Sequence, residues 1–459
     1  MSAAACHRRT RAIYASAGRL SRIFVPRFWR HPPAGRLSFH ACSPAARVRG
    51  SRAFVADAFH PRRIRALWLC GILHAFTHLY TTALFPLYLI LQRDLRLAGE
   101  AQATFLVTAL GFAYCLASLP MGVLADRVDR RFLLGAGLAA NGLAFIGLSQ
   151  APSYGWAIAF AMAAGLAGSF FHPAATSMVA DLFPDQRGKA LGRVAIGAAF
   201  GFWFGPAYSG WRATSAGWRA PVLELGLMGL AMAVAFFLLA PPAPAQPHPS
   251  EAHPHRHPSL SRAGFWALIV LAGWLFSFRD FAAAGVATTL SLFLQHARGF
   301  DAAATGVLLG GMCLVSLVSN PLFGAMSDRV RLRLAAALIG LAAVAIAFVP
   351  WVSRAWLVPL LLFHMFFFMA NFPVVEAALM EAVPAKTRGR VFGLFFTICG
   401  TIGNSAHWVS GGLVQRLPDQ TSQAYTPLFF GWAVLMLLSI SGLTVLNAIR
   451  HRPRLAEDA

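Results

Sequence analysis

The sequence predicts an all-α membrane protein whose twelve transmembrane helices form two related six-helix bundles. Of its 459 residues, 57% are hydrophobic and 12% are charged, whereas about a quarter of the residues in a soluble domain are charged. Apolar runs of the roughly 20 residues that a helix needs to cross a bilayer recur along the chain. A charged stretch from Gly122 to Arg131 also returns from Gly324 to Arg333. The two copies indicate two related halves.

Residues 1–64 are predicted to form a basic N-terminal tail that has no fold of its own. The segment is rich in Arg, Ala and Ser, and Asp57 is its only acidic residue. This composition is typical of disorder. It also fits a targeting peptide, or translation from a start codon placed too early. All three interpretations stay open.

Six apolar spans are expected in the first bundle, residues 65–240, and six in the second, residues 263–449. The spans of the first bundle are 67–91, 103–124, 132–151, 154–181, 190–211 and 220–240. The spans of the second bundle are 264–294, 304–324, 333–352, 356–381, 390–414 and 426–448. A short tail, residues 450–459, follows the last span.

A segment rich in Pro and His, residues 241–262, joins the two bundles. Its histidines are His248, His253, His255 and His257. Such a composition is typical of a flexible spacer. A His-rich tract can also bind metal, but only Glu251 and no cysteine accompanies these histidines, which favours the spacer.

Basic residues in the short loops predict the orientation of the chain. The loops after spans 2, 4, 6, 8 and 10 carry two or three Arg or Lys residues each, and the loops on the other side carry at most two. By the positive-inside rule, both termini and the linker are cytoplasmic. We expect a multi-pass protein of the plasma membrane, the inner membrane of a bacterium.

Several classes of protein are disfavoured. The formal net charge of +22 is distributed between the spans and in the tails rather than over one face, which argues against nucleic-acid binding. The six cysteines include no C-x-x-C pair, so neither a disulfide framework nor a zinc site is indicated. No P-loop is present, which argues against an ATP-driven pump. We expect no cofactor, no metal and no enzymatic activity.

A Pro-acid-Pro pattern near the ends of spans 4 and 10 extends the repeat. Its members are Pro173, Asp181 and Pro184 in the first copy and Pro373, Glu381 and Pro384 in the second. The spacing is the same in both copies. Because six is an even number of crossings, two such halves run parallel in the membrane.

The charged repeat carries a family resemblance. The first copy reads G-x-L-A-D-R-x-D-R-R and closely resembles the signature of the major facilitator superfamily, and the second copy is looser; the resemblance covers about residues 65–450. The matched positions are Gly122, Asp126, Arg127 and Arg130, and Gly324, Asp328 and Arg329 in the second copy. The resemblance implies a latch between the bundles that holds the outward-facing state. The alternative is topology alone, in which the arginines keep the loop inside.

Span 5 contains a second matching motif. Gly201, Gly205, Pro206 and Gly210 resemble the G-x-x-x-G-P-x-x-G-G pattern of the family's antiporters, and Ser209 departs from it. With Gly197, these glycines present bare backbone on one helix face, so plain packing against a neighbouring helix is the competing interpretation.

Ionisable side chains inside the spans are the best candidates for a transport site, because a charge at the bilayer centre costs at least about 2.5 kcal/mol. Arg279 and Asp280 lie at the middle of span 7. Adjacent helical residues point about 100° apart, so we expect each to have its partner elsewhere, with Glu376 a candidate for Arg279. Arg279 would hold an anionic substrate, and Asp280 or Glu376 would carry a coupling proton. A purely structural salt bridge is the alternative.

The resemblance implies that spans 1, 4, 7 and 10 line a central cavity. The candidate residues on them are His74, His78, His172, Arg279, Asp280, His364 and Glu376. His74 and His78 share a helix face and would relay a proton, contact substrate, or only bond to each other. His172 beside Pro173 would contact substrate, or only satisfy backbone freed by the kink. With Phe85-Pro86-Leu87, these histidines also resemble the fosmidomycin-resistance branch.

We therefore predict a monomeric secondary transporter that works by alternating access, with the lipid bilayer, a small organic substrate and protons as its partners and no nucleic acid. Proton-coupled efflux is the first choice. Uptake by symport, facilitated diffusion, and a non-transporting sensor or assembly factor on the same scaffold are the alternatives.

Overall fold

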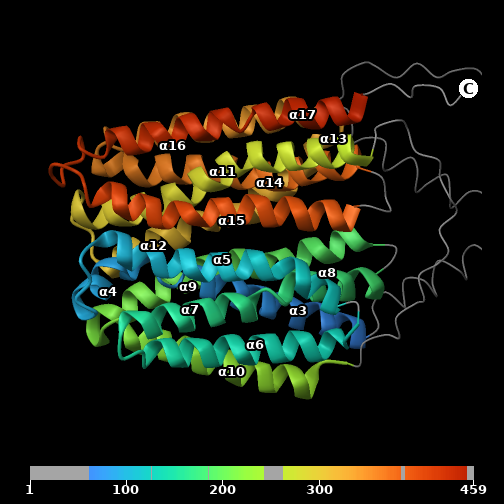
Figure 1. Ribbon diagram of the computed structural model, residues 1–459, viewed down its shortest axis with the longest axis horizontal. Coiled ribbons are helices and arrows are strands. Elements are labelled where there is room, and N and C mark those ends of the chain that lie inside the picture. Colours follow the sequence, from blue (N-terminus) through green and yellow to red (C-terminus); the bar gives the residue numbers. More distant parts are fainter. Residues whose placement is uncertain (1–60, 126, 184–185, 242–261, 384–387, 452–459) are drawn as a thin grey trace, which may run out of the picture. The chain divides into compact units, whose positions relative to one another are not determined.

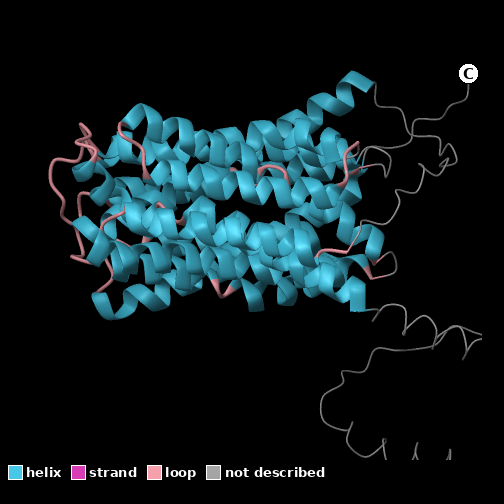
Figure 2. Cartoon of the chain, turned by 90° about the horizontal axis from the view of Figure 1, so that it is seen from below, coloured by secondary structure: helices cyan, strands magenta, loops and turns pink. Residues whose placement is uncertain are grey.

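The computed structural model describes residues 61–125, 127–183, 186–241, 262–383 and 388–451 (Figure 1). Every regular element in these ranges is a helix. Figure 2 shows the loops gathered mainly at the two ends of the helices. The start of α3 and the end of α17 lie at the same end, on the right in Figure 1.

The first half contains eight α-helices and one 3₁₀ helix within the described residues. They are α3 (Pro61–Thr82), η1 (Phe85–Leu87), α4 (Tyr88–Asp94), α5 (Glu100–Ala125), α6 (Arg130–Ser149), α7 (Tyr154–Gly168), α8 (Phe171–Leu182), α9 (Arg187–Ala216) and α10 (Arg219–Leu239). The expected span 67–91 is broken around Pro86, because proline lacks the N–H that continues a helix. α3 begins at Pro61, inside the segment expected to be an unfolded tail.

The second half contains seven α-helices within the described residues. They are α11 (Arg262–His296), α12 (Ala302–Cys313), α13 (Ser316–Ala347), α14 (Arg354–Ala382), α15 (Arg388–Val414), α16 (Thr426–Leu438) and α17 (Ser441–His451). The loop expected from 324 to 333 is helical and belongs to α13. The residues between α10 and α11 that make up most of the linker, 242–261, lie outside the described ranges.

Eight helical stretches of the described residues are long and apolar enough to cross a membrane. They are Glu100–Ala125, Arg130–Ser149, Tyr154–Leu182, Arg219–Leu239, Ala263–His296, Ala302–Met326, Arg354–Ala382 and Thr426–Ile449. The other expected spans lie on α3, α9, α13 and α15. In α3 and α9 the His, Thr and Gly residues that contact neighbouring helices also lower the hydropathy.

Helix packing follows the division into halves. In the first half α3 packs on α9, and α6 packs on α7 and α10; in the second, α11 packs on α15 and α16, and α13 packs on α14. Two extensive contacts cross between the halves, α9 with α12 and α5 with α15. Figure 1 shows α5 beside α15 at the centre of the bundle.

The glycine stripe of α9 lies at two of these helix contacts. A Cβ on Gly201 would lie 2.1 Å from the carbonyl oxygen of Ala75 on α3, and one on Gly210 would lie 2.2 Å from that of Ala302 on α12. Carbon and oxygen cannot approach so closely, so only glycine permits these backbones to touch. The antiporter-like segment therefore packs α9 against its own half and against the other half.

Polar contacts between the halves gather at the end opposite the described chain ends. The hydroxyl of Ser291 donates to the carbonyl oxygen of Phe85 at 2.6 Å. The hydroxyls of Tyr88 and Thr288 lie 3.3 Å apart. A carboxylate oxygen of Glu100 lies 3.4 Å from Nε2 of His296. These contacts hold the two halves together at that end.

Thr108 makes an inter-half contact of a different kind. Its hydroxyl donates to the carbonyl oxygen of Asn404 at 2.8 Å and accepts the N–H of Trp408 at 3.0 Å. Asn404 and Trp408 are four apart on α15, so the hydroxyl bridges a carbonyl and an N–H that would otherwise pair within the helix. Thr108 thus links α5 to the backbone of α15.

Replacing Thr108 with valine should weaken this link. Valine has nearly the same shape but no hydroxyl, and losing two neutral hydrogen bonds that α15 can partly remake costs about 1 kcal/mol. We expect the population with separated halves at this end to rise about fivefold. Distances between spin labels at the exposed positions Arg96 and Thr421, in a protein lacking Cys6 and Cys42, would measure it.

Thr104→Val is the matched control, because the hydroxyl of Thr104 donates to Ala101 of its own helix. An equal shift in both variants would show that the bond from Thr108 to α15 is not responsible.

Candidate functional site

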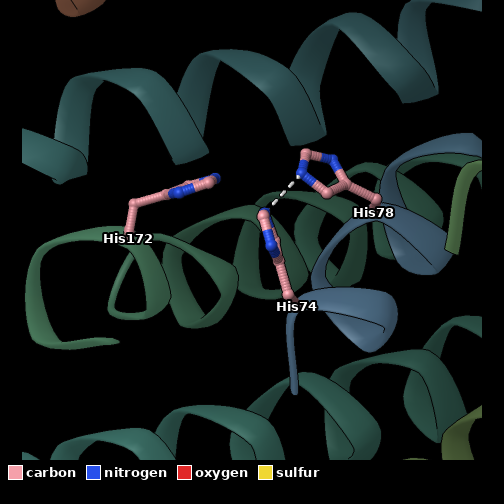
Figure 3. A group of neighbouring side chains, drawn as sticks. All are labelled: His74, His78 and His172. Atoms are coloured by element: carbon pink, nitrogen blue, oxygen red, sulfur yellow. Dashed lines mark hydrogen bonds between the residues drawn. The ribbon is translucent and has the colours of Figure 1, made fainter. Parts of the chain in front are cut away.

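Three histidines from two helices meet in the first half. His74 and His78 lie one turn apart on α3, and His172 lies in the first turn of α8. One ring nitrogen from each of the three falls within 4.8 Å of the other two, and Figure 3 shows the three rings directed into the same space. We call this group the histidine cluster. All three side chains are half-buried.

A backbone carbonyl sets the tautomer of His74. Its Nδ1 lies 3.0 Å from the carbonyl oxygen of Val194 on α9, which can only accept a proton, so Nδ1 carries the hydrogen. In the neutral ring, Nε2 of His74 then has a free lone pair, and it lies 3.1 Å from Nε2 of His78. His78 donates this bond when the cluster is otherwise empty.

Aromatic rings surround the histidine cluster. His78 stacks on Phe202 of α9, with ring centroids 4.1 Å apart, and His74 stacks on Phe171 at 4.8 Å. The rings of Tyr114 on α5 and Phe396 on α15 also lie beside the ring of His172, with centroids 6.3 and 6.2 Å from its centroid. Because Phe396 belongs to the second half, His172 lies where the two halves meet.

The second half contains an arginine cluster, formed by Arg279, Asp280 and Asn371. Nε of Arg279 donates to a carboxylate oxygen of Asp280 at 2.7 Å, and Nη1 donates to the amide oxygen of Asn371 on α14 at 3.0 Å. The guanidinium also lies over the ring of Phe372, 4.2 Å from its centroid. Arg279 is only 4% exposed, so its charge is met by a carboxylate, an amide and an aromatic face.

The expectation that Arg279 and Asp280 each have a partner elsewhere is wrong, because the two residues pair with each other. Their Cα–Cβ bonds do diverge by about 100° around α11. The arginine side chain has enough rotatable bonds to fold back along the helix, and a buried guanidinium without a carboxylate would be very costly. Adjacent residues therefore pair here although their starting directions differ.

Glu376 lies near the arginine cluster without joining it. It lies one turn after Phe372 on α14, but it forms no ion pair with Arg279 or Asp280 within the described residues, and its side chain is exposed. The position has a counterpart in the first half: residues 171–180 and 371–380 show the same order of buried and exposed positions. Thr176 is exposed where Glu376 is, and Phe171 is buried where Asn371 is.

His364 lies apart from both clusters. It is buried on α14, and its Nδ1 bonds to the carbonyl oxygen of Ala342 on α13 at 2.8 Å. Asn371, in contrast, is a site residue that was not among the sequence candidates. The signal in the sequence is an amide inside an expected span, at a position where the first copy of the repeat has phenylalanine.

α15 connects the two clusters. A Cβ on Gly403 would lie 3.0 Å from Cβ of Asp280, and the amide of Asn404 reaches Sγ of Cys115 on α5. Tyr114, next to Cys115, lies against His172 and Phe396. The histidine and arginine clusters are thus joined through α5 and α15, the helices of one inter-half contact.

The charged repeat makes ion pairs within each half. Arg130 binds Asp181 at 2.5 Å, and Arg331 binds Glu381. The two acids are the middle members of the Pro-acid-Pro pattern, so each half ties the end of its fourth span to the charged stretch. Gly122 lies against Pro173 of the same half.

Other members of the charged repeat are only partly described. Arg127 is exposed, and Gly324 lies within α13. Asp126 lies outside the described residues, as do the side chains of Asp328 and Arg329. The expected latch therefore stays a prediction.

Membrane-crossing helices in two halves, with polar and charged side chains inside the bundle, are typical of polytopic membrane transporters. Residues 67–406 match the profile of the Major Facilitator Superfamily. The chain belongs to this family, and its fold is the all-α polytopic fold of these transporters.

Two curated relatives and one solved structure show the range of similarity. MFS-type transporter SLC18B1 of Mus musculus is 25% identical over 222 residues, covering 47% of each chain. Methylenomycin A resistance protein of Bacillus subtilis is 31% identical over 142 residues, covering 31% of this chain and 27% of that protein. The chain thus spans at most about half the length of these relatives.

A crystal structure of a bacterial homologue of the human lysosomal transporter Spinster, inward-facing and unoccupied, superimposes with a TM-score of 0.64 at 18% identity. The superposition covers 85% of this chain and 96% of that one.

Proposed function

We propose that this transporter exports a small organic molecule from a bacterial cytoplasm across the inner membrane in exchange for protons, with both termini cytoplasmic. The arginine cluster carries the proposal. Burying a guanidinium and a carboxylate in a membrane protein costs free energy. The pair would have a function if the carboxylate were alternately protonated and replaced by a substrate anion.

The coupling follows from competition for Arg279. While Asp280 is ionised, it occupies one edge of the guanidinium and Asn371 occupies another. A proton on Asp280 would weaken that bond and leave the guanidinium to an anionic or polar substrate group. Glu376, exposed and one turn after Phe372 on α14, is the second carboxyl group through which a proton would pass.

Two further observations support export by exchange. Of the α9 glycines that resemble the antiporter motif, Gly201 and Gly205 lie against α3 of the same half, and Gly210 lies against Ala302 of the other half. A relative that matches part of the chain is a resistance protein, which fits removal of a toxic compound.

Asp280→Asn should abolish coupling; the amide oxygen can still accept the bond from Nε of Arg279, so we expect the site to form at lower stability. We expect proton-driven accumulation in vesicles to fall by at least about tenfold, and Glu376→Gln to reduce it less. Substrate exchange without a pH gradient should persist in both variants. The substrate would first be found by growth inhibition with a compound panel, with and without the gene, and accumulation would then be measured under pH gradients of each sign.

Asp419→Asn is the control for removal of a carboxylate. Asp419 lies in the loop between α15 and α16, where bonds from Thr421 lower its pKa. Full proton-driven transport in both Asp280→Asn and Glu376→Gln, at normal protein levels, would rule out these carboxylates as coupling groups. Accumulation only under the opposite gradient would indicate uptake by symport.

A further inference from the structure

We propose that His74, His78 and His172 form a binding site for a first-row divalent transition-metal ion such as Zn²⁺ or Co²⁺, with one coordination position left open. The sequence places two of these histidines on one helix, but the third comes from α8, and only the fold brings it to the other two. The proposal does not depend on which organic molecule is transported or in which direction.

The spacing of the nitrogens fits a tetrahedral metal. Histidine nitrogens lie about 2.0 to 2.1 Å from zinc, so two of them at a tetrahedral angle are about 3.3 to 3.4 Å apart. The Nε2 atoms of His74 and His78 are 3.1 Å apart. The nitrogen of His172 lies within 4.8 Å of both, so moving it inward by about 1.5 Å, a change within reach of a side-chain rotation, completes three ligands.

The neighbours of His74 also resemble those of a metal ligand. A metal-bound histidine usually donates its other ring N–H to a carbonyl or carboxylate, which fixes the tautomer. The Nδ1–H of His74 makes such a bond to Val194 on α9. Stacking of His78 on Phe202 and of His74 on Phe171 further restricts the two rings.

The composition of the cluster selects the metal. Three imidazoles suit Zn²⁺, Co²⁺, Ni²⁺ or Cu²⁺, whereas Mg²⁺ and Ca²⁺ require oxygen ligands. No carboxylate belongs to the group, so three neutral ligands leave the ion its full charge. A fourth position open to water or to an anion distinguishes such a site from structural zinc sites, in which the protein supplies all four ligands. Since only neutral imidazole binds metal, protons compete with the ion.

The test uses the purified full-length protein in detergent, without a polyhistidine tag, and Co²⁺ as the probe. Metal binding by the linker must first be removed, because its histidines would bind the ion independently of the cluster. These are His248, His253, His255 and His257. In a variant with these four replaced by serine, we expect one Co²⁺ per chain, the strong visible absorption of tetrahedral Co²⁺, and displacement by Zn²⁺ and by acid.

In that background, His74→Ala, His78→Ala and His172→Ala should each weaken Co²⁺ binding by about 100-fold or more, since even partners behind the ligands contribute 10- to 100-fold. His364→Gln is the matched control, because His364 is a buried histidine whose ring bonds to Ala342 on α13, away from the cluster. Co²⁺ should raise the thermal unfolding temperature of the linker variant and of the control, but not that of the cluster variants.

A measurement without substitutions in the cluster covers the case in which one of those variants fails to fold. X-ray absorption of Zn²⁺ bound to the linker variant should show three imidazole ligands. Absence of a stoichiometric site in the linker variant, an oxygen-only coordination shell, or undiminished binding in folded cluster variants would each overturn the proposal.

Discussion

Arg279→Met should abolish transport and destabilise the protein by about 3 to 5 kcal/mol, the cost of leaving one member of a buried ion pair behind. Arg279 is almost fully buried and satisfies both Asp280 and Asn371. Without it, the Asp280 carboxylate loses its only described cation at bonding distance. The free energy of unfolding in detergent and the transport rate at matched protein levels would measure the two effects.

A double variant separates the role of Arg279 in folding from its role in transport. Arg279→Met with Asp280→Met removes both charges, so the desolvation penalty disappears and stability should return to within about 1 to 2 kcal/mol of the wild type. Transport should stay absent, since the group proposed to bind substrate is missing. Normal transport in the double variant would show that the pair is only structural.

Arg279→Lys is the conservative companion. Lysine keeps the positive charge but lacks the planar fork that reaches Asp280 and Asn371 together. We expect a smaller loss of stability than in Arg279→Met and a marked loss of transport. A lysine variant with wild-type transport would indicate that the charge alone suffices.

Gly201→Leu should have the second largest effect, a failure of α3 to pack on α9. Even a Cβ at this position would lie 2.1 Å from the carbonyl oxygen of Ala75, and that atom belongs to a helix backbone, which cannot move aside alone. Overpacking in a well-packed interior costs about 1 to 3 kcal/mol, and separating two helices costs more. Yield of folded protein and thermal unfolding would measure the loss.

Gly192→Leu is the control within the same helix. Gly192 is exposed on α9, and no atom outside its own helix lies within 4 Å of its Cβ position. The same substitution there should leave the unfolding temperature within a few degrees. An equal loss in both variants would point to the cost of glycine replacement in general rather than to the contact with α3.

Much of the fold was predictable because the bilayer imposes length and hydropathy on each span. The class, the two halves and the helices α5, α6, α9 and α10 follow from apolar runs and the repeat, whereas the single span expected at 154–181 is divided into α7 and α8. Local breaks were less predictable: Pro86 splits the first span into α3, η1 and α4, and the charged stretch near Asp328 is helical although its composition is typical of a loop.

The sequence indicated several of the clustered residues, but it did not indicate Asn371 or the pairing of Arg279 with Asp280. The cost of charge in a bilayer identified Arg279, Asp280 and Glu376 from their positions alone. The direction of the Cα–Cβ bond does not determine where the guanidinium of a long arginine side chain lies. The bond from Arg279 to Asp280 was therefore not predicted. The convergence of His172 on His74 depends on how α8 lies against α3, and no local pattern encodes that.

The seam between α9 and α12 bears on how the halves move. Gly306 and Gly310 of α12 face the backbone of Pro206 and Trp203, and Gly210 faces that of Ala302. At these positions backbone meets backbone directly, through many weak contacts. Separating α9 from α12 would lose these contacts and would be costly. A small sliding or rotation of one helix on the other would keep most of them. We therefore expect the contact between α9 and α12 to persist throughout the transport cycle. The ends of the two halves would open and close while this contact acts as the pivot.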